Sequence, residues 1–365
     1  MKKSFILLFT LLTSNFLIKA QADLPVVALC IAAPSAENVE EFVEFIDNEL
    51  APSGINTLIL RVDFNYDYKL RPELRDENPL SFNDVKSLVN VCEKNNINLI
   101  PQVNLLGHQS WASTLNKLLE VYPEFDETPH VKLPENYKWP NSDGLYCKSY
   151  CPLHPKVHEV VYDLIDEIVE VFEAKDFHAG MDEVFYIADE NCSRCKGLDP
   201  AELFAGEVTL LSNHLNKTDK KLWIWGDRLI EGELSGIGMW EGSTNNTEKA
   251  IDLIPKNVVI CDWHYEKAIP TPAYFSLKGL NVIACSWRKP SVANEQVKMM
   301  HDFRSNSPDK MRDNFLGVMH TYWSSAKKFM DDYKTINPPI NEEGSEVECF
   351  KEMVESVKKL NQKNN

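Results

Sequence analysis

The chain has 365 residues, of which 44% are hydrophobic and 25% are charged, as is usual for a globular protein and not for a disordered one. It carries 38 basic against 55 acidic residues, which gives a formal net charge of −17 at pH 7. A protein that binds nucleic acid through the phosphates needs a basic face, so this balance argues against a nucleic-acid partner.

The first 22 residues have the organisation of a secretory signal peptide. Lys2 and Lys3 precede an apolar run from Phe5 to Leu12, and the segment closes on Ala20-Gln21-Ala22, the small-x-small pattern that signal peptidase cleaves. An uncleaved anchor is the alternative, but the apolar run is shorter than the roughly 20 residues that span a bilayer. We therefore expect residues 1–22 to be removed and the remainder to be exported, to the periplasm or the medium, without a membrane attachment.

Short β-branched runs alternate with segments of helical periodicity along the rest of the chain. In chain order, the expected strands are Val26–Ala32, Thr57–Val62, Asn98–Val103, Asp176–Gly180, Leu222–Trp225, Val258–Asp262, Asn281–Ser286 and Phe315–Tyr322. The expected amphipathic helices include Val39–Glu49, Phe82–Lys94, Val157–Phe172, Ala201–Leu215 and Asn294–Ser305.

Eight such units in about 300 residues predict an α/β fold, a (β/α)8 TIM barrel that forms a single domain over residues 23–341. A doubly wound open sheet is the alternative, but no Gly-rich phosphate loop follows the first strand. Residues 342–365 are expected to form a charged surface helix with a frayed tail.

Residues that follow the expected strands carry the functional prediction, because the active sites of such barrels lie at the C-terminal ends of the strands. These positions are rich in Trp, Tyr, His and carboxylates. They are Ala33–Ser35, Asp63–Tyr66, Asn104–His108, Met181–Glu183, Gly226–Asp227, Trp263–Tyr265, Trp287–Arg288 and Trp323–Ser324. Aromatic faces beside carboxylates suit a sugar, so we expect a carbohydrate site that needs no cofactor.

The adjacent carboxylates Asp182 and Glu183 stand out because they follow a buried strand that contains His178 and Gly180. Adjacent carboxylates in different environments can have pKa values that are pushed apart, so that one stays ionised and the other holds a proton. A general acid beside an orienting anion needs this arrangement. The same dipeptide also begins at Asp76, Asp126, Asp166 and Asp189, which we interpret as solvated loops or helix faces.

The segment His178-Ala179-Gly180-Met181-Asp182-Glu183 resembles the signature of glycoside hydrolase family 20, the β-N-acetylhexosaminidases. Three further stretches resemble the family's third-strand motif, the segment before its fourth strand and its fifth-strand Trp-x-Asp motif. They are Ile100–His108, Leu145–Pro155 and Trp223–Asp227. The resemblance extends over most of the chain, roughly from Asn56 to Trp323.

This resemblance implies a retaining, substrate-assisted glycosidase that acts on terminal β-linked N-acetylglucosamine or N-acetylgalactosamine. It assigns Glu183 as acid and base, Asp182 as the partner of the acetamido N–H, and Tyr265, with Tyr322 as second choice, as the donor to the acetamido oxygen. The remaining implied substrate-binding residues are His108, His178, Trp225, Asp227, Trp240, Trp263 and Trp323. For His108 and His178, the alternative is a structural role in the core, with the ring nitrogens hydrogen-bonded within the protein.

The sequence departs from the family pattern in two places. Gln102, Asn104 and Leu106 replace family residues on the third strand, and the arginine that grips sugar hydroxyls has no counterpart at the end of the first strand. Arg61 and Arg71 are possible substitutes. These departures leave the exact sugar open.

Eight of the nine cysteines fall into two kinds of environment. Cys30, Cys92, Cys261 and Cys285 lie in or beside apolar runs and are expected in the core. The cysteines in polar loops are Cys147, Cys151, Cys192 and Cys195. They suit two disulfides, the interpretation favoured by export, or a structural zinc site of four cysteines or one that includes His154.

Three other functions remain open. One is a glycosidase of the same fold with shifted specificity, and another is a carbohydrate-binding barrel without catalysis, which would have no need of the acid Glu183. The third is a metal hydrolase that uses Asp63, His108, His178 and Asp182, although these lack the close spacing of familiar metal motifs. No feature of the sequence indicates an oligomeric state.

Overall fold

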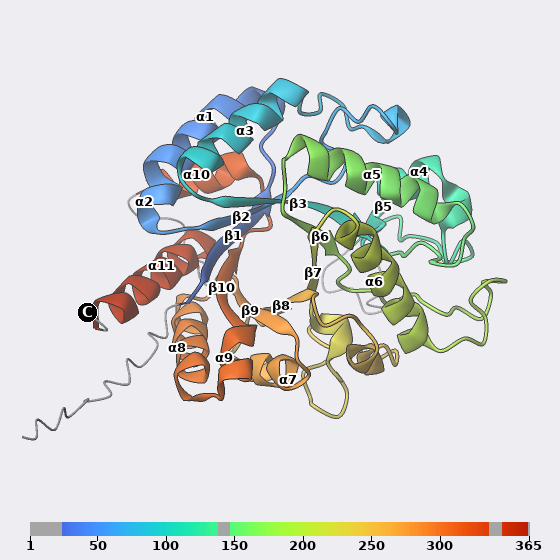
Figure 1. Ribbon diagram of the computed structural model, residues 1–365. Helices are drawn as coiled ribbons and strands as arrows, with labels where there is room; N and C mark the ends of the chain where they lie inside the picture. The colour runs from blue at the N-terminus through green and yellow to red at the C-terminus, as the bar shows by residue number, and fades with distance from the viewer. Residues whose placement is uncertain (1–23, 138–146, 336–344, 364–365) are drawn as a thin grey trace, which may run out of the picture.

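Eight parallel strands form a closed barrel in the order β1-β10-β9-β8-β7-β6-β3-β2, and β1 pairs with both β2 and β10 to complete the ring (Figure 1). The computed structural model describes residues 24–137, 147–335 and 345–363, so the predicted signal peptide, residues 1–22, lies outside the described chain. The barrel strands are β1 (Val26–Ala32), β2 (Thr57–Arg61), β3 (Asn98–Leu105), β6 (Asp176–Gly180), β7 (Lys221–Trp225), β8 (Val259–Trp263), β9 (Asn281–Ser286) and β10 (Phe315–Thr321). The predicted (β/α)8 fold is confirmed.

Helices surround the barrel, one layer deep (Figure 1). The main ones are α1 (Val39–Phe45), α3 (Phe82–Lys94), α5 (Val157–Val171), α6 (Pro200–Asn216), α7 (Thr271–Leu277), α8 (Pro290–Asn306), α10 (Ala326–Lys334) and α11 (Glu346–Lys363). Between β7 and β8, where all residues are described, the chain forms only the short 3-10 helices η5 (Asp227–Leu229) and η6 (Glu248–Asp252).

Two apolar clusters explain why the strands read as continuous hydrophobic runs. Ala28 and Cys30 of β1 face the barrel interior, whereas Leu29 and Ile31 pack between the barrel and the helices. Successive strand residues point to opposite faces, and both faces of this sheet are covered. The interior cluster ends in aromatic residues at the C-terminal mouth, where the site lies.

The first predicted helix is divided. The segment predicted as Val39–Glu49 forms α1, then the π-helical turn η2 (Ile46–Leu50), then α2 (Ala51–Ser53). Gly54, with φ of 99°, ends this run in the left-handed conformation that glycine adopts without strain.

The C-terminal helix is more than a charged surface element. α11 buries Cys349, Phe350 and Met353 in the main core and packs along α8, with further contacts to β10 and α10. Its charged residues lie on the opposite side of an amphipathic helix. The predicted charged helix exists, but it belongs to the helical layer of the barrel.

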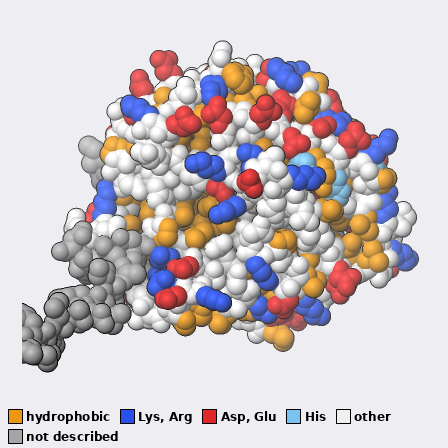
Figure 2. Space-filling model, viewed as in Figure 1, with side chains coloured by type: hydrophobic (Ala, Val, Ile, Leu, Met, Phe, Trp, Pro, Cys, Tyr) orange, Lys and Arg blue, Asp and Glu red, His pale blue; other side chains and the backbone are white. Residues whose placement is uncertain are grey.

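Charges of both signs are scattered over the face seen in Figure 2, with no continuous basic surface in that view. Among the described residues, no helix is both long enough and apolar enough to cross a membrane.

Candidate active site

Two tight turns at the ends of β3 and β6 position the central side chains. Leu106 and His108 after β3, and Met181 and Glu183 after β6, have φ values of 60°, 52°, 67° and 49°. Non-glycine residues rarely occupy this region, and such strain concentrates at functional sites. Between the two turns, a Cβ at Gly107 would lie 2.5 Å from the backbone oxygen of Asp182, so only glycine permits this approach.

His108 joins the two predicted catalytic carboxylates. Its Nε2 lies 3.1 Å from Asp182 Oδ2 and 3.2 Å from Glu183 Oε2. The three side chains are largely buried, with 16%, 11% and 12% of their surfaces exposed, so solvent screens the interaction of their charges only in part. The histidine thus acts as a partner of both carboxylates.

The protonation states of His108 and Asp182 depend on each other. Burial alone would lower the pKa of His108, but the charge of the Asp182 carboxylate and its hydrogen bond with the imidazole raise that pKa well above its ordinary value. Burial would raise the pKa of Asp182, but the His108 imidazolium lowers it. Asp182 therefore stays anionic at neutral pH.

One oxygen of that anion has no partner within the described chain. Asp182 Oδ2 faces His108, while Asp182 Oδ1 is buried and accepts no hydrogen bond from any described residue. A buried carboxylate oxygen without a partner costs free energy. Such an oxygen is an acceptor held ready for a donor that arrives with a ligand.

Cys147 also belongs to this site. Its Sγ lies 3.3 Å from Glu183 Oε2 and 3.6 Å from His108 Nδ1, and burial raises the pKa of the thiol to about 12. The neutral thiol therefore donates to Glu183. Sequence reasoning placed Cys147 with the other loop cysteines, and no local signal linked it to the acid.

Asp227 stabilises the turn after β6 that carries Glu183. Its Oδ2 accepts a 2.9 Å hydrogen bond from the backbone N–H of Glu183 and a 2.7 Å bond from Arg228 Nε. Its Oδ1 accepts from Trp263 Nε1 at 3.2 Å. These hydrogen bonds show that Asp227 helps to position Glu183 and Trp263, and its predicted role in substrate binding stays a prediction.

Tyr265 lies at the mouth of the barrel with its hydroxyl group held from two sides. Its Oη accepts a hydrogen bond from Trp323 Nε1 at 3.1 Å and one from Thr321 Oγ1 at 3.3 Å. Burial raises the pKa of Tyr265 well above its ordinary value, so the phenol keeps its proton. That proton is available to an acceptor on a ligand.

The backbone of Tyr265 is fixed by a network that sequence reasoning missed. Glu241 Oε1 accepts a hydrogen bond from the Tyr265 N–H at 3.2 Å, and Glu241 Oε2 lies 2.7 Å from His264 Nδ1. His264 Nε2 lies 3.1 Å from Asp262 Oδ1. Burial would lower the pKa of His264, but the carboxylates of Asp262 and Glu241 raise it to about 10.

The second tyrosine choice, Tyr322, is wrong. Tyr322 is fully buried outside the barrel interior, its ring packs on Phe329 of α10, and its hydroxyl donates to Asp332 at 3.3 Å. Strand alternation explains this, because Thr321 and Trp323 point toward Tyr265 and the residue between them points outward.

The predicted tryptophans gather in the interior cluster with Tyr265. Trp225 lies 5.7 Å from Trp323 and Trp263 lies 5.0 Å from Tyr265, measured between ring centroids, while Trp240 packs at the edge of this cluster. The ring centroid of His178 lies 4.7 Å from that of Trp225, and His178 Nδ1 accepts a hydrogen bond from the Gly180 N–H. His178 is fully buried, but its Nε2 has no hydrogen-bond partner in the described chain, so it is not the fully satisfied core histidine of the alternative.

Of the two arginine candidates, only Arg61 faces the mouth. Its guanidinium lies 4.7 Å from the ring centroid of Trp323, and its buried Nε has no partner in the described chain. Arg71 instead pairs with Glu159 and Asp163 on α5.

Two of the three third-strand replacements, Gln102 and Asn104, form a polar network beside the site. Gln102 Nε2 donates to Asn104 Oδ1 at 3.0 Å, and the Asn104 N–H donates to Asp63 Oδ1 at 2.7 Å. Asp63 is thus engaged with backbone and amide groups, not with His108 or His178. Among the described residues, no group with metal-ligand geometry includes Asp63, His178 or Asp182, so the predicted metal-hydrolase set does not assemble.

Two other groups in the described chain have ligand atoms close enough for a metal ion. One is His108, Cys147 and Glu183 at the mouth, and the other is Glu127, Cys151, Cys192 and Cys195. The predicted grouping of four cysteines is therefore wrong for Cys147. Glu127, which the sequence placed in a solvated loop, is fully buried.

Comparisons with known proteins show what the chain as a whole is similar to. Residues 66–336 match the family model described as glycosyl hydrolase family 20, catalytic domain. The chain is 28% identical over 159 residues to a lacto-N-biosidase of Bifidobacterium bifidum, covering 40% of this chain and 13% of that protein. It is 23% identical over 196 residues to a β-hexosaminidase of Emericella nidulans, covering 50% of this chain and 29% of that protein.

Solved structures share the fold. A Flavobacterium johnsoniae chitobiase superposes with a TM-score of 0.64 at 15% identity, over 93% of this chain and 51% of that one. A Vibrio harveyi exo-β-N-acetylglucosaminidase in complex with N-acetylglucosamine superposes with a TM-score of 0.62 at 13% identity, over 92% of this chain and 54% of that one. This chain thus spans about half or less of these relatives. The family match covers most of its length, and the chain belongs to glycosyl hydrolase family 20.

Proposed function

We propose that the protein hydrolyses terminal β-linked N-acetylglucosamine or N-acetylgalactosamine, with the acetamido group of the substrate as the nucleophile. The observation that carries this proposal is the buried oxygen Asp182 Oδ1, which lacks a partner in the described chain and lies beside the candidate acid Glu183. An acetamido N–H is a donor that would satisfy it.

The reaction begins at the anomeric carbon. The acetamido carbonyl oxygen attacks this carbon, the glycosidic bond breaks, and Glu183 gives its proton to the departing oxygen. The resulting oxazolinium ion carries positive charge, which the anionic Asp182 stabilises. Glu183 then takes a proton from water as the water attacks the same carbon, which restores the acid and retains the anomeric configuration.

Tyr265 supports the attacking group. Its hydroxyl proton points to the acetamido oxygen, while Trp323 and Thr321 hold the hydroxyl oxygen in place. The aromatic walls from Trp225, Trp263 and Trp323 enclose the acetamido methyl group. A fixed donor aimed at a reacting oxygen needs no reorganisation during the reaction.

Arg61 replaces the missing first-strand arginine in this proposal. Its unpartnered Nε lies at the end of β2, next to Trp323. A guanidinium donor at this place would bind a hydroxyl group of the terminal sugar.

The test is release of p-nitrophenol from its β-N-acetylglucosaminide and β-N-acetylgalactosaminide by the wild-type protein and by Glu183→Gln. Loss of a general acid is expected to lower kcat by about 10²–10⁴-fold. A wild type that is inactive on both sugars, but active on glycosides without the acetamido group, would replace this proposal with a glycosidase of shifted specificity. Binding without any turnover would favour a carbohydrate-binding barrel.

We further propose that the protein is exported after cleavage behind Ala22. The supporting observation is the basic, apolar and small-residue pattern of residues 1–22. N-terminal sequencing of the protein recovered outside the cytoplasm should begin at Asp23, and an intact Met1 would contradict the proposal.

A further inference from the structure

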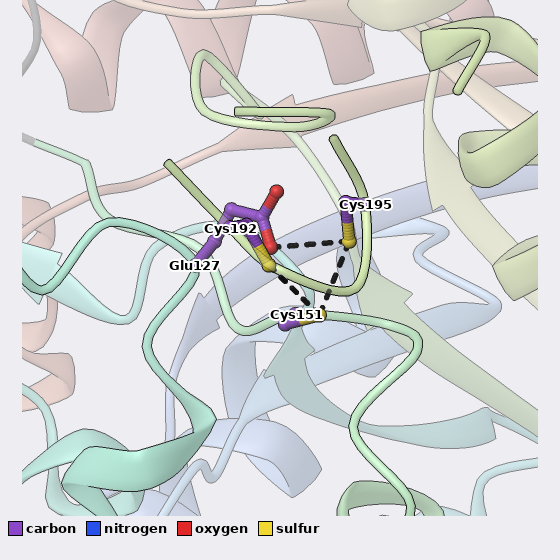
Figure 3. Close-up of side chains that lie close together, drawn as sticks. All are labelled: Glu127, Cys151, Cys192 and Cys195. Carbon is purple, nitrogen blue, oxygen red and sulfur yellow. Dashed lines mark hydrogen bonds between the residues drawn. The ribbon is translucent and has the colours of Figure 1, made fainter. Parts of the chain in front are cut away.

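Three cysteines and a glutamate meet in a buried cluster away from the catalytic mouth. Cys151 Sγ lies 3.1 Å from Cys195 Sγ and 3.6 Å from Cys192 Sγ, and Cys195 Sγ lies 3.3 Å from Glu127 Oε2. The four ligand atoms all lie within 4.8 Å of one another. The side chains come from two segments of the chain, one with Glu127 and Cys151 and the other with Cys192 and Cys195, and converge on one another (Figure 3).

These separations are close to those around a tetrahedral zinc ion. With Zn–S bonds of about 2.3 Å and a Zn–O bond of about 2.1 Å, neighbouring sulfurs lie about 3.8 Å apart, and a sulfur and an oxygen about 3.6 Å apart. Three thiolates and one carboxylate form a complete set of four ligands. The carboxylate also disfavours copper(I), which prefers sulfur alone.

Surrounding groups orient the ligands. The backbone N–H of Asp189 donates to Glu127 Oε1 at 3.0 Å, which leaves Oε2 directed at the sulfurs. Arg194 Nε donates to Cys151 Sγ at 3.3 Å, and its positive charge offsets part of the excess negative charge that four anionic ligands bring to a dication. Such outer partners are typical of metal sites.

A disulfide does not satisfy this cluster as well as a metal ion does. Cys151 contacts two other thiols but can bond to only one, and a Cys151–Cys195 bridge would leave Cys192 and Glu127 buried beside it. A dication instead binds the Glu127 carboxylate and all three sulfurs at once.

We propose that Glu127, Cys151, Cys192 and Cys195 bind one structural zinc ion. The site joins the segment between β3 and α5, which supplies Glu127 and Cys151, to the segment between β6 and α6, which supplies the other two cysteines. The first segment also holds His108, and the second begins next to Asp182. The ion therefore holds together the two loops whose other ends form the catalytic mouth.

Elemental analysis of the purified full chain, produced with zinc and without chelators, tests the proposal. We expect about one zinc ion per chain in the wild type and in the control variants Cys92→Ala and Cys147→Ser. Cys151→Ser and Cys195→Ser should fall to background. Zinc that is lost from Cys147→Ser and kept by Cys151→Ser would assign the metal to the catalytic mouth and overturn the proposal.

A second measurement does not depend on the variants folding. Wild-type protein from cells grown with cobalt in place of zinc should show the intense visible absorption bands and the thiolate-to-cobalt charge-transfer band of a tetrahedral site. After unfolding in chelator without reductant, all nine cysteines should react with iodoacetamide. A metal-free protein, or one with a disulfide between any two of Cys151, Cys192 and Cys195, would overturn the proposal.

Discussion

Replacing His108 with glutamine tests how the site keeps Asp182 ionised. Glutamine retains a hydrogen-bond donor but carries no charge. Two unit charges 3.1 Å apart interact by about 5 kcal/mol at an effective dielectric constant of about 20. Both side chains are partly exposed, at 16% and 11%, so solvent screening should leave half of this or less. Losing up to about 2.5 kcal/mol of this attraction should therefore raise the pKa of Asp182 in His108→Gln.

The assay is the pH dependence of kcat/KM, which reports ionisations of the free enzyme. If Asp182 must be ionised, the acid limb of the profile should move to higher pH in His108→Gln. The control His301→Gln, on α8, should leave the limb in place. An unchanged acid limb in His108→Gln, with the fold intact by circular dichroism, would refute the assigned role of His108.

Three further changes probe the supports of the site. Gly107→Ala places a Cβ 2.5 Å from the Asp182 backbone oxygen, so it should lower kcat and reduce the free energy of unfolding, measured in urea, by about 1–3 kcal/mol. The control Gly206→Ala has open space around its Cβ and should change neither quantity. Tyr265→Phe removes the donor to the acetamido oxygen and should lower kcat by about 10²–10³-fold in steady-state kinetics. The pKa of His264 is raised to about 10, so its stabilisation is full below about pH 6.5 and is lost as the pH rises through 10. The difference in melting temperature between wild type and His264→Gln should therefore shrink between pH 7 and pH 10, and a constant difference would contradict this.

The strands could be predicted because their signal is local. A sheet covered on both faces makes each strand a continuous apolar run, and this pattern placed Val26–Ala32, Asp176–Gly180 and Asn281–Ser286 with the bounds that the structure has. Because both faces are buried, hydrophobicity alone does not show which strand residues face the barrel interior. Successive strand residues point to opposite faces, so if Thr321 faces inward, Tyr322 must face the helices.

The cysteine and glutamate contacts could not be predicted, because they depend on how long loops close over the barrel. Cys147 and Cys151 are four residues apart, yet one contacts Glu183 and the other contacts Cys195. Glu127 looks like part of a solvated acidic dipeptide until the loop that carries Cys195 covers it. Spacing along the chain says little where no regular element fixes the direction of a side chain.

The central claim is that the acetamido oxygen of the substrate attacks the anomeric carbon while Asp182 and Glu183 assist. Fluorine atoms on the acetamido methyl group withdraw electrons and make that oxygen a poorer nucleophile. We predict that kcat/KM for p-nitrophenyl glycosides with mono-, di- and trifluoroacetamido groups falls steeply with each added fluorine. Rates that do not depend on the number of fluorine atoms would show that another group attacks the anomeric carbon and would contradict the account.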